Sequence, residues 1–249
     1  MLLNLGGTRS SLKSDHLLHT PDAFIRTPLP GASAVEFIVH TAPQLGARFT
    51  QMTAEFAAGG TLAPPLPGVQ RFLFVLSGSL TLTADGASTP LSPNGFAFIP
   101  ADVAHSITAE APARVALIEK PYQPLDDTDT QQTIVTGNES DLSSESLGGD
   151  PDLLVRRMVP DGPAWDFAVN TMTYAPGAAL SQVEIHIMEH GLLMLEGGGI
   201  YRLGDHWYPV TAGDFIWMAP YCPQWFGAIG KTPAKYLIYK DWYRHPLAP

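Results

Sequence analysis

A carboxylate and two imidazoles lie close together in residues 177–197 of the chain. Glu184 and His186 are two residues apart, so on a β-strand both side chains leave the same face, and His190 is in phase with them. This mixed oxygen and nitrogen ligand set suits Mn(II), Fe(II) or Zn(II) better than Ca(II) or Mg(II). The stretch therefore predicts a site for a divalent metal ion. The alternative is that these are polar residues on the wet face of an antiparallel strand.

The composition bounds the class of protein and its partners. A net charge of -10 argues against nucleic acid, because no basic face could neutralise the phosphates. The single cysteine, Cys222, excludes an intrachain disulfide and fits a reducing compartment. The first residues lack the basic segment of a signal peptide, and no apolar run approaches the roughly 20 residues that a spanning helix needs. We therefore expect a soluble, cytoplasmic protein with no nucleic-acid or membrane partner.

Short strands and tight turns are expected along the whole chain. The 23 glycines and 23 prolines favour turns over long helices. Alternating, β-branched and aromatic runs predict strands at 34–40, 47–56, 71–76, 79–83, 95–100, 105–108 and 114–119, and again at 153–158, 167–174, 191–197, 200–203, 214–220 and 234–240. Between the two sets, residues 126–152 are rich in Asp, Glu, Ser and Gly, and they are predicted to be an acidic, solvated linker.

The two sets of strands repeat one another. Gly78 aligns with Gly197, Phe96 with Phe215 and His105 with Gln224, and the members of each pair are 119 residues apart. A repeat of whole all-β units indicates a duplicated β-barrel. The predicted domains are an N-terminal barrel at 1–125, the linker at 126–152 and a C-terminal barrel at 153–249.

Each unit resembles the cupin superfamily. The order is the same: a ligand-bearing strand pair ending in Gly, a hairpin, then a strand that ends in Pro and leads to one more ligand. Cupins usually supply two His and a Glu from the first motif and a His from the second, where this chain has Gln224. A Glu-x-His-x3-His motif followed by Gln resembles the (S)-ureidoglycine aminohydrolases, which are bicupin enzymes of allantoin degradation. Residues 188–191, 199–201 and 236–241 are also similar to that family, whereas the N-terminal half resembles it only in fold.

The resemblance implies an all-β bicupin, with two tandem double-stranded β-helix barrels and one Mn(II) per chain in the C-terminal barrel. The implied metal ligands are Glu184, His186, His190 and Gln224.

The same resemblance places Tyr201, Tyr236 and Lys240 in the substrate pocket, with Lys240 and Glu184 as catalytic residues. Strand parity agrees for Tyr236 and Lys240, because residues four apart share a face. The alternatives are an aromatic of the barrel wall for Tyr201 and an exposed lysine at a strand end for Lys240.

The implied reaction is hydrolysis of (S)-ureidoglycine, a small anion with an amine on its central carbon, to (S)-ureidoglycolate and ammonia. The family also implies a homo-oligomer, a dimer or larger. Two other functions stay open at this point: another mononuclear-metal cupin enzyme, such as an Fe(II) dioxygenase, and a cupin that binds a small molecule without catalysis.

The N-terminal unit lacks the metal ligands. Pro65, Pro67 and Arg71 stand where the first motif has Glu184, His186 and His190, which leaves only His105. We therefore expect this barrel to be an inactive scaffold and a dimer surface. Arg71 is expected to be salt-bridged or exposed rather than to bind an anion.

Two further residues lie beside the predicted ligands. Glu189 is expected to point away from the ligand face into solvent. Cys222, two residues before Gln224, lies near the metal or serves as a small buried hydrophobe, the commoner role of a free cysteine.

Overall fold

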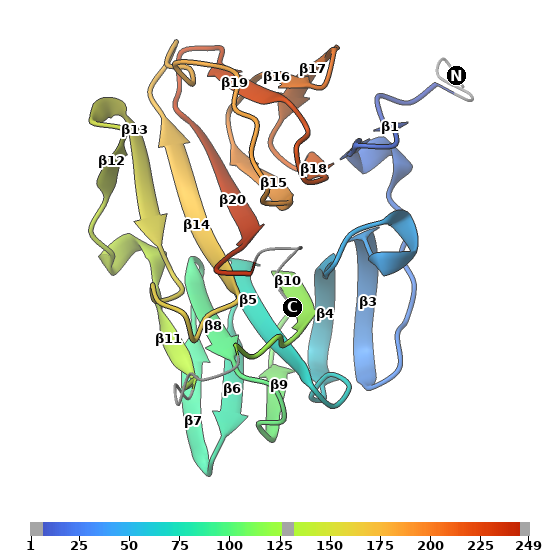
Figure 1. Ribbon diagram of the computed structural model, residues 1–249. Coiled ribbons are helices and arrows are strands. Elements are labelled where there is room, and N and C mark those ends of the chain that lie inside the picture. Colours follow the sequence, from blue (N-terminus) through green and yellow to red (C-terminus); the bar gives the residue numbers. More distant parts are fainter. Residues whose placement is uncertain (1–6, 126–131, 245–249) are drawn as a thin grey trace. The chain divides into compact units, whose positions relative to one another are not determined.

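The computed structural model describes residues 7–125 and 132–244, whose regular secondary structure is almost entirely β-strand (Figure 1). They form two compact units. The first, the N-terminal barrel, contains residues 25–125, 132–142 and 158–166; the second, the C-terminal barrel, contains residues 7–24, 143–157 and 167–244. The prediction of an all-β chain is confirmed. The helices in the described ranges are single 3₁₀ turns, and none has the length or apolar character needed to cross a membrane.

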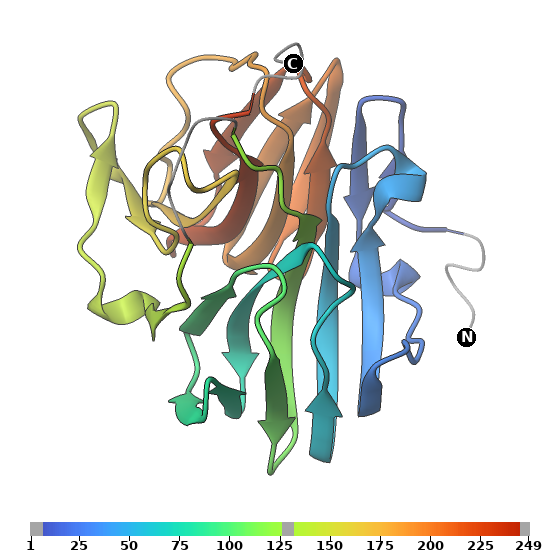
Figure 2. The same ribbon diagram turned by 60° about the horizontal axis from the view of Figure 1, so that its bottom comes forward.

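The N-terminal barrel is built on a sheet with the strand order β11-β8-β5-β10-β4-β9-β6-β7, and β3 pairs with β4. Figure 2 shows the long β3 and β4, in blue, running side by side. The strands are β3 (Ala32–Thr41), β4 (Thr50–Leu62), β5 (Val69–Ser77), β6 (Leu80–Ala84), β7 (Ala87–Leu91), β8 (Gly95–Ile99), β9 (His105–Ala109), β10 (Ala113–Pro121) and β11 (Val135–Asn138), with 3₁₀ turns η2 (Pro43–Leu45) and η3 (Glu139–Asp141).

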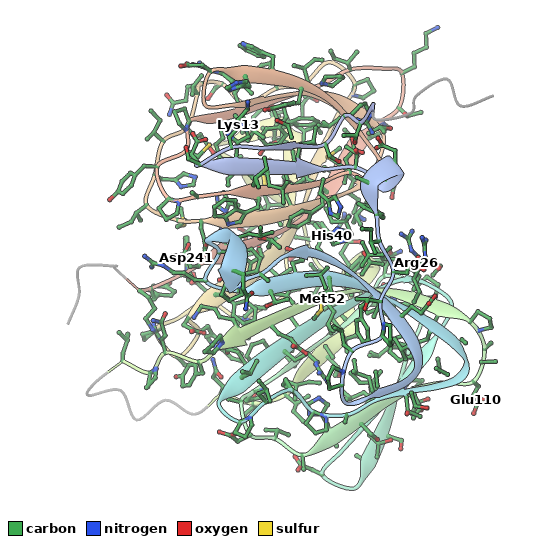
Figure 3. The ribbon with its side chains drawn as sticks, turned by 90° about the vertical axis from the view of Figure 1, so that its right-hand side faces the viewer. Lys13, Arg26, His40, Met52, Glu110 and Asp241 are labelled. Carbon is green, nitrogen blue, oxygen red and sulfur yellow. The ribbon has the colours of Figure 1, made fainter. Side chains whose placement is uncertain are left out.

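Alternate residues of these strands fill the interior of the N-terminal barrel. Leu73 and Val75 of β5 face Leu117 and Val115 of β10 across the ladder, and all four are buried in one core. Met52 of β4 pairs with Leu117 and joins the same core; Figure 3 labels Met52 together with His40 of the neighbouring β3. The period of two that predicted these strands is therefore the period that buries their apolar face.

The C-terminal barrel has one sheet in the order β1-β2-β18-β15-β20-β14-β13-β12 and a second in the order β17-β16-β19. Its elements are β1 (Ser11–Leu12), β2 (His16–His19), η1 (Pro21–Ala23), β12 (Glu145–Leu147), β13 (Asp150–Arg157), β14 (Phe167–Tyr174), β15 (His190–Glu196), β16 (Gly198–Leu203), β17 (His206–Thr211), β18 (Phe215–Met218), β19 (Gln224–Ala228) and β20 (Ala234–Asp241). Its core gathers Leu192 and Met194 of β15 with Tyr236 and Ile238 of β20 and Phe226 of β19.

The internal repeat reappears in the strand pairing. In the N-terminal barrel, Arg71 of β5 pairs with Ile99 of β8 and Glu119 of β10. In the C-terminal barrel, His190 of β15 pairs with Met218 of β18 and Lys240 of β20. The offset of 119 therefore holds for β5 and β8, but it becomes 121 in the last strand, because the β19–β20 connection is two residues longer than the β9–β10 connection.

The compact units differ from the three predicted ranges. β2 pairs with β18, so residues 7–24 belong with the C-terminal barrel although they open the chain. Part of the predicted linker is also ordered: β11 pairs with β8, and β12 pairs with β13. Residues 126–131 of that linker lie outside the described ranges. The charged composition of 132–152 marks edge strands here, which expose one side of the ladder to water.

The prediction that Glu184 and His186 lie on a strand is wrong. Residues 181–189 are irregular apart from one isolated bridge at Glu184, and β15 begins only at His190. The apolar run after His190 carries the regular ladder, whereas the polar residues before it lie in a loop.

Candidate metal and substrate site

Two segments of the C-terminal barrel are joined by a pair of backbone hydrogen bonds. The Glu184 N–H donates to the Gln224 carbonyl at 2.8 Å, and the Gln224 N–H donates to the Glu184 carbonyl at 2.9 Å. This two-bond bridge fixes the otherwise irregular 181–189 segment against the start of β19. The residues of the first and second motifs are thereby held side by side, 40 residues apart in sequence.

Three of the four predicted ligands converge. His186 Nε2 lies 3.2 Å from His190 Nε2 and 2.7 Å from Gln224 Nε2. His190 and Gln224 are buried, and His186 is half-buried. The two imidazole rings meet edge to face, with their centroids 4.8 Å apart.

The protonation of His190 is set by its surroundings. Its Nδ1–H donates to the Tyr239 carbonyl at 3.2 Å, which leaves a lone pair on Nε2, the atom that faces His186. Burial, followed by the neighbouring His186 and Lys240, lowers the pKa of His190 to about 3. A neutral imidazole whose distal nitrogen is anchored by a backbone carbonyl is the usual form of a metal-binding histidine.

The donor set fits a divalent cation. His186 Nε2 faces both an imidazole lone pair and the Gln224 amide, and one ring nitrogen cannot satisfy both as donor and acceptor at once. A cation among the three groups would satisfy all of them once the Gln224 amide turns its oxygen toward the ion. His186 Nδ1 is also buried and has no hydrogen-bond partner among the described residues.

Glu184 is less closely grouped with the two histidines. The ligand atoms of Glu184, His186 and His190 do not all lie within 4.8 Å of one another. Its negative charge nevertheless contributes to raising the pKa of Tyr174, Tyr201 and Tyr236, so the half-buried carboxylate lies near those phenols. The structure therefore brings together His186, His190 and Gln224, with Glu184 at the side of the cluster that faces the tyrosines.

Tyrosines from three strands meet inside the barrel. The Tyr201 hydroxyl lies 3.5 Å from Gln224 Oε1, and the Tyr236 hydroxyl lies 2.8 Å from that of Tyr174. All three side chains are at most 2% exposed. Burial raises the pKa of Tyr174, Tyr201 and Tyr236 well above the ordinary value of 10, so each phenol keeps its proton at neutral pH. These groups can donate hydrogen bonds but cannot act as bases.

Comparison with known proteins gives the family of this chain. The cupin domain model matches residues 52–119 and 170–239, one match in each barrel. An (S)-ureidoglycine aminohydrolase of Arabidopsis thaliana is 39% identical over 243 residues, which are 97% of this chain and 80% of the relative. The enzyme of the same name from Escherichia coli K12 is 30% identical over 90% of this chain and 87% of its own length. The crystal structure of protein Ylba from E. coli has a TM-score of 0.86 and 26% identity over 100% of both chains.

This chain belongs to the (S)-ureidoglycine aminohydrolase family of bicupins. The predicted architecture of two tandem cupin barrels is thereby confirmed.

Lys240 lies on the interior face of its cupin barrel. It pairs with His190 across the ladder and shares its face with Tyr236 and Ile238, which are core residues. Its ammonium lies 4.5 Å from the ring centroid of Trp242, a cation–π contact. The half-buried ammonium is therefore held beside the histidine cluster.

Tyr174 is the residue of this bicupin site that sequence reasoning missed. It ends β14, a strand that was predicted, and its hydroxyl shares a hydrogen bond with Tyr236. The signal available in the sequence was the alternation of side chains along the strand. Tyr174 is two residues from Met172 and so shares its face of the sheet, and Met172 pairs with Tyr236 of β20.

The prediction that Glu189 is solvated is wrong. Glu189 is fully buried, accepts a hydrogen bond from Trp217 Nε1 at 3.2 Å, and its backbone N–H donates to Asp241 at 2.6 Å. The residue before His190 is thereby fixed on both sides, which holds the histidine at the first position of β15.

Cys222 is 4% exposed and joins the core of this cupin barrel, in agreement with its predicted role as a small buried hydrophobe.

The Cys222 thiol also lies close to Asp15 and His16. The ligand atoms of these three residues are within 4.8 Å of one another, the only such group of Asp, Glu, His and Cys in the described ranges. His16 already contacts Asp15 at 2.8 Å through Nδ1 and the Tyr208 hydroxyl at 2.9 Å through Nε2. Burial raises the pKa of Cys222 to about 11, so the sulfur is a thiol.

The N-terminal cupin barrel has no histidine cluster in its described residues. Arg71, at the position of His190, forms a salt bridge with Glu119 at 2.6 Å and is 2% exposed. The expected salt-bridged state of Arg71 is confirmed, and its alternative, an exposed arginine, is wrong.

Proposed function

We propose that this protein hydrolyses (S)-ureidoglycine to (S)-ureidoglycolate and ammonia, with Mn(II) bound in the C-terminal barrel. The observation that carries the proposal is the convergence of His186, His190 and Gln224 in a chain 39% identical to an (S)-ureidoglycine aminohydrolase. The reaction breaks the bond from the central carbon to its amine and forms a bond from that carbon to a water oxygen, and ammonia leaves.

The metal ligands in this proposal are His186, His190, Gln224 and Glu184. They are one carboxylate, two neutral imidazoles and one amide, a set that carries a single negative charge. When bound, Mn(II) supplies a Lewis acid that fixes the substrate and stabilises developing negative charge. The choice of Mn(II) over Fe(II) or Zn(II) rests on the family, because these ligands accept all three.

Lys240 binds the anionic end of the substrate in this proposal. Its ammonium is half-buried beside His190 and is held in place by the Trp242 ring. A carboxylate in that position gains a charge-assisted hydrogen bond, stronger than a neutral one in a site that excludes water. Fixing the carboxylate orients the central carbon, and such positioning contributes to the rate because it removes the entropy of a bimolecular encounter.

The phenols of Tyr201 and Tyr236 supply neutral hydrogen-bond donors. Because burial keeps both protonated, they can orient a substrate oxygen or pass a proton along the Tyr236–Tyr174 hydroxyl pair. Glu184, whose charge contributes to raising the pKa of both phenols, is the carboxylate that accepts a proton in this proposal.

The test is ammonia release from freshly generated (S)-ureidoglycine, corrected for its spontaneous decay. Protein stripped of metal by a chelator should release ammonia at the background rate, and addition of Mn(II) should restore activity more fully than Fe(II) or Zn(II). Full activity in the stripped protein would contradict the proposal. Oxygen consumption is the control, because hydrolysis consumes none and an Fe(II) dioxygenase would.

We further infer that the enzyme works as a homo-oligomer in the cytoplasm, within allantoin degradation. The single cysteine fits a reducing compartment. The C-terminal barrel exposes Ile185, Trp207, Tyr221 and Ile229, each at least 58% accessible in the single chain, and burying such side chains between copies would remove apolar surface from water. Light scattering coupled to size exclusion should give a mass of at least twice 26.8 kDa, and a monomeric mass would contradict the inference.

A further inference from the structure

The N-terminal barrel contains a cavity of about 420 Å³, lined by residues of its own strands and loops. Its walls are apolar and include Phe37, Met52, Leu62 and Leu117, all of them core residues. The rim is formed by residues 63–67, the segment that replaces the first ligands of the metal motif with prolines. Cavities of this size, mostly apolar with a few polar groups, are typical of small-molecule sites.

The polar groups of the cavity are Arg71 and Glu119, which both line it. Arg71 Nε and Nη2 donate to the same Glu119 oxygen, Oε1, at 2.9 and 2.6 Å. Arg71 Nη1 donates to the Ala63 carbonyl at 2.7 Å and to His105 Nε2 at 3.0 Å. His105 can accept this bond because its Nδ1–H donates to the Val103 carbonyl at 2.8 Å.

The hydrogen-bond inventory leaves one donor and one acceptor side by side. A guanidinium has five N–H groups, and four of those of Arg71 have partners, so one N–H of Nη2 has none among the described residues. Glu119 uses only Oε1 in the described hydrogen bonds, and its side chain is 21% exposed, so Oε2 remains open to a ligand. The charges of the pair cancel, which leaves the cavity without a net charge from these two residues.

We propose that the N-terminal barrel binds a small molecule that carries a neutral primary carboxamide on a short apolar body. The amide oxygen accepts from Arg71 Nη2, the amide N–H donates to Glu119 Oε2, and the apolar body lies against Met52, Phe37 and Leu117. A carboxylate would place its charge next to Glu119, and an amine would leave Arg71 without an acceptor. A charged ligand would also lose more hydration energy on entering apolar walls than a neutral one.

The test uses pentanamide, pentanoate and pentylamine as probes, with the full-length protein labelled at its methionine methyl groups with ¹³C. The Met52 methyl reports the cavity, whereas Met172 and Met194 lie in or against the core of the other barrel. Pentanamide should shift the Met52 resonance in a saturable manner and bind at least about tenfold more tightly than pentanoate, the ratio that one lost hydrogen bond to a charged group produces. The Met172 and Met194 resonances should not move.

Glu119→Gln is the decisive variant. The amide oxygen of Gln can still accept from Arg71, while its NH₂ group replaces the open acceptor with a donor and leaves the net charge of Arg71 unbalanced. The preference should therefore reverse, so that pentanoate binds more tightly than pentanamide, while unchanged Met172 and Met194 resonances show that the protein is folded. Absence of a Met52 shift with pentanamide, or the same ligand preference in wild type and variant, would overturn the proposal.

Discussion

The two barrels share one pattern of strand pairing but differ in what they place inside it. Where the C-terminal barrel pairs His190 with Lys240, the N-terminal barrel pairs Arg71 with Glu119. Gln224, which pairs with Leu203, corresponds to His105, which pairs with Ala84. One barrel therefore gathers imidazole and amide groups that a metal cation can join, whereas the other holds a guanidinium and neutralises it with a carboxylate.

The interior tyrosines show the same contrast. By their register on the equivalent strands, Tyr174, Tyr201 and Tyr236 correspond to Phe56, Leu82 and Val115, which lie in the apolar core of the N-terminal barrel. A barrel with three buried hydroxyl groups must satisfy them by hydrogen bonds, and these groups can also serve a substrate. A barrel that keeps apolar residues there can bind only by shape and by the few polar groups at its end.

The comparison is tested most strongly by replacing one polar residue inside each barrel in turn. His190→Ala should lower kcat/KM by more than about 100-fold, because loss of a direct ligand exceeds the 10- to 100-fold cost of outer-shell changes at metal sites. Glu119→Gln, in the N-terminal barrel at the position equivalent to Lys240, should leave kcat/KM unchanged. Steady-state ammonia release at saturating Mn(II) measures both, and equal losses in the two variants would show that the barrels are not functionally distinct.

A second comparison uses two lysines of β20 that point to opposite faces. Lys240→Met should lower kcat/KM by roughly 10- to 100-fold, the size expected when a group that positions the substrate is lost. Lys235→Met, five residues earlier and on the other face of the strand, should have no effect. Metal content should stay the same in both. A Lys240→Met enzyme with wild-type kcat/KM would remove this residue from the substrate site.

Sequence reasoning identified the fold because the apolar alternation that defines each strand also fills each barrel. It grouped Glu184, His186 and His190 by their spacing and added Gln224 through the family resemblance, although it placed Glu184 and His186 on a strand; the structure brings His186 close to His190 and Gln224. The loop at 181–189 could not be foreseen, because its geometry depends on the backbone bridge from Glu184 to Gln224, a long-range contact. The buried Glu189 was missed for the same reason: its partner Trp217 is 28 residues away.

The hydrogen bond between the Tyr174 and Tyr236 hydroxyls, which the apolar core of the N-terminal barrel lacks, predicts an effect on stability. Tyr236→Phe or Tyr174→Phe should each lower the free energy of unfolding by about 1 kcal/mol, the usual net value of one internal hydrogen bond. The double variant should cost less than the sum of the two single variants, since both remove the same bond. Urea unfolding of the four proteins measures this coupling, and strict additivity would mean that the two hydroxyls do not interact.

The smallest expected effect is the response of the N-terminal barrel to acid. Burial lowers the pKa of His105, so below its ordinary value of 6.5 the unfolded chain binds a proton that the folded chain does not. This contribution to stability is present above that pH and is lost as the pH falls below it. His105→Gln should therefore lose less thermal stability than wild type between pH 7.5 and 5.5, as followed by circular dichroism. An equal loss in the two proteins would contradict the expectation.

The central claim is that the C-terminal barrel alone holds the metal, and metal content per chain tests it most directly. After dialysis against Mn(II) and removal of free ion, elemental analysis should find one Mn per chain in the wild type and in Glu119→Gln, and close to none in His190→Ala. Retention of one Mn per chain by His190→Ala would contradict the claim, because the ion would then be held elsewhere in the molecule.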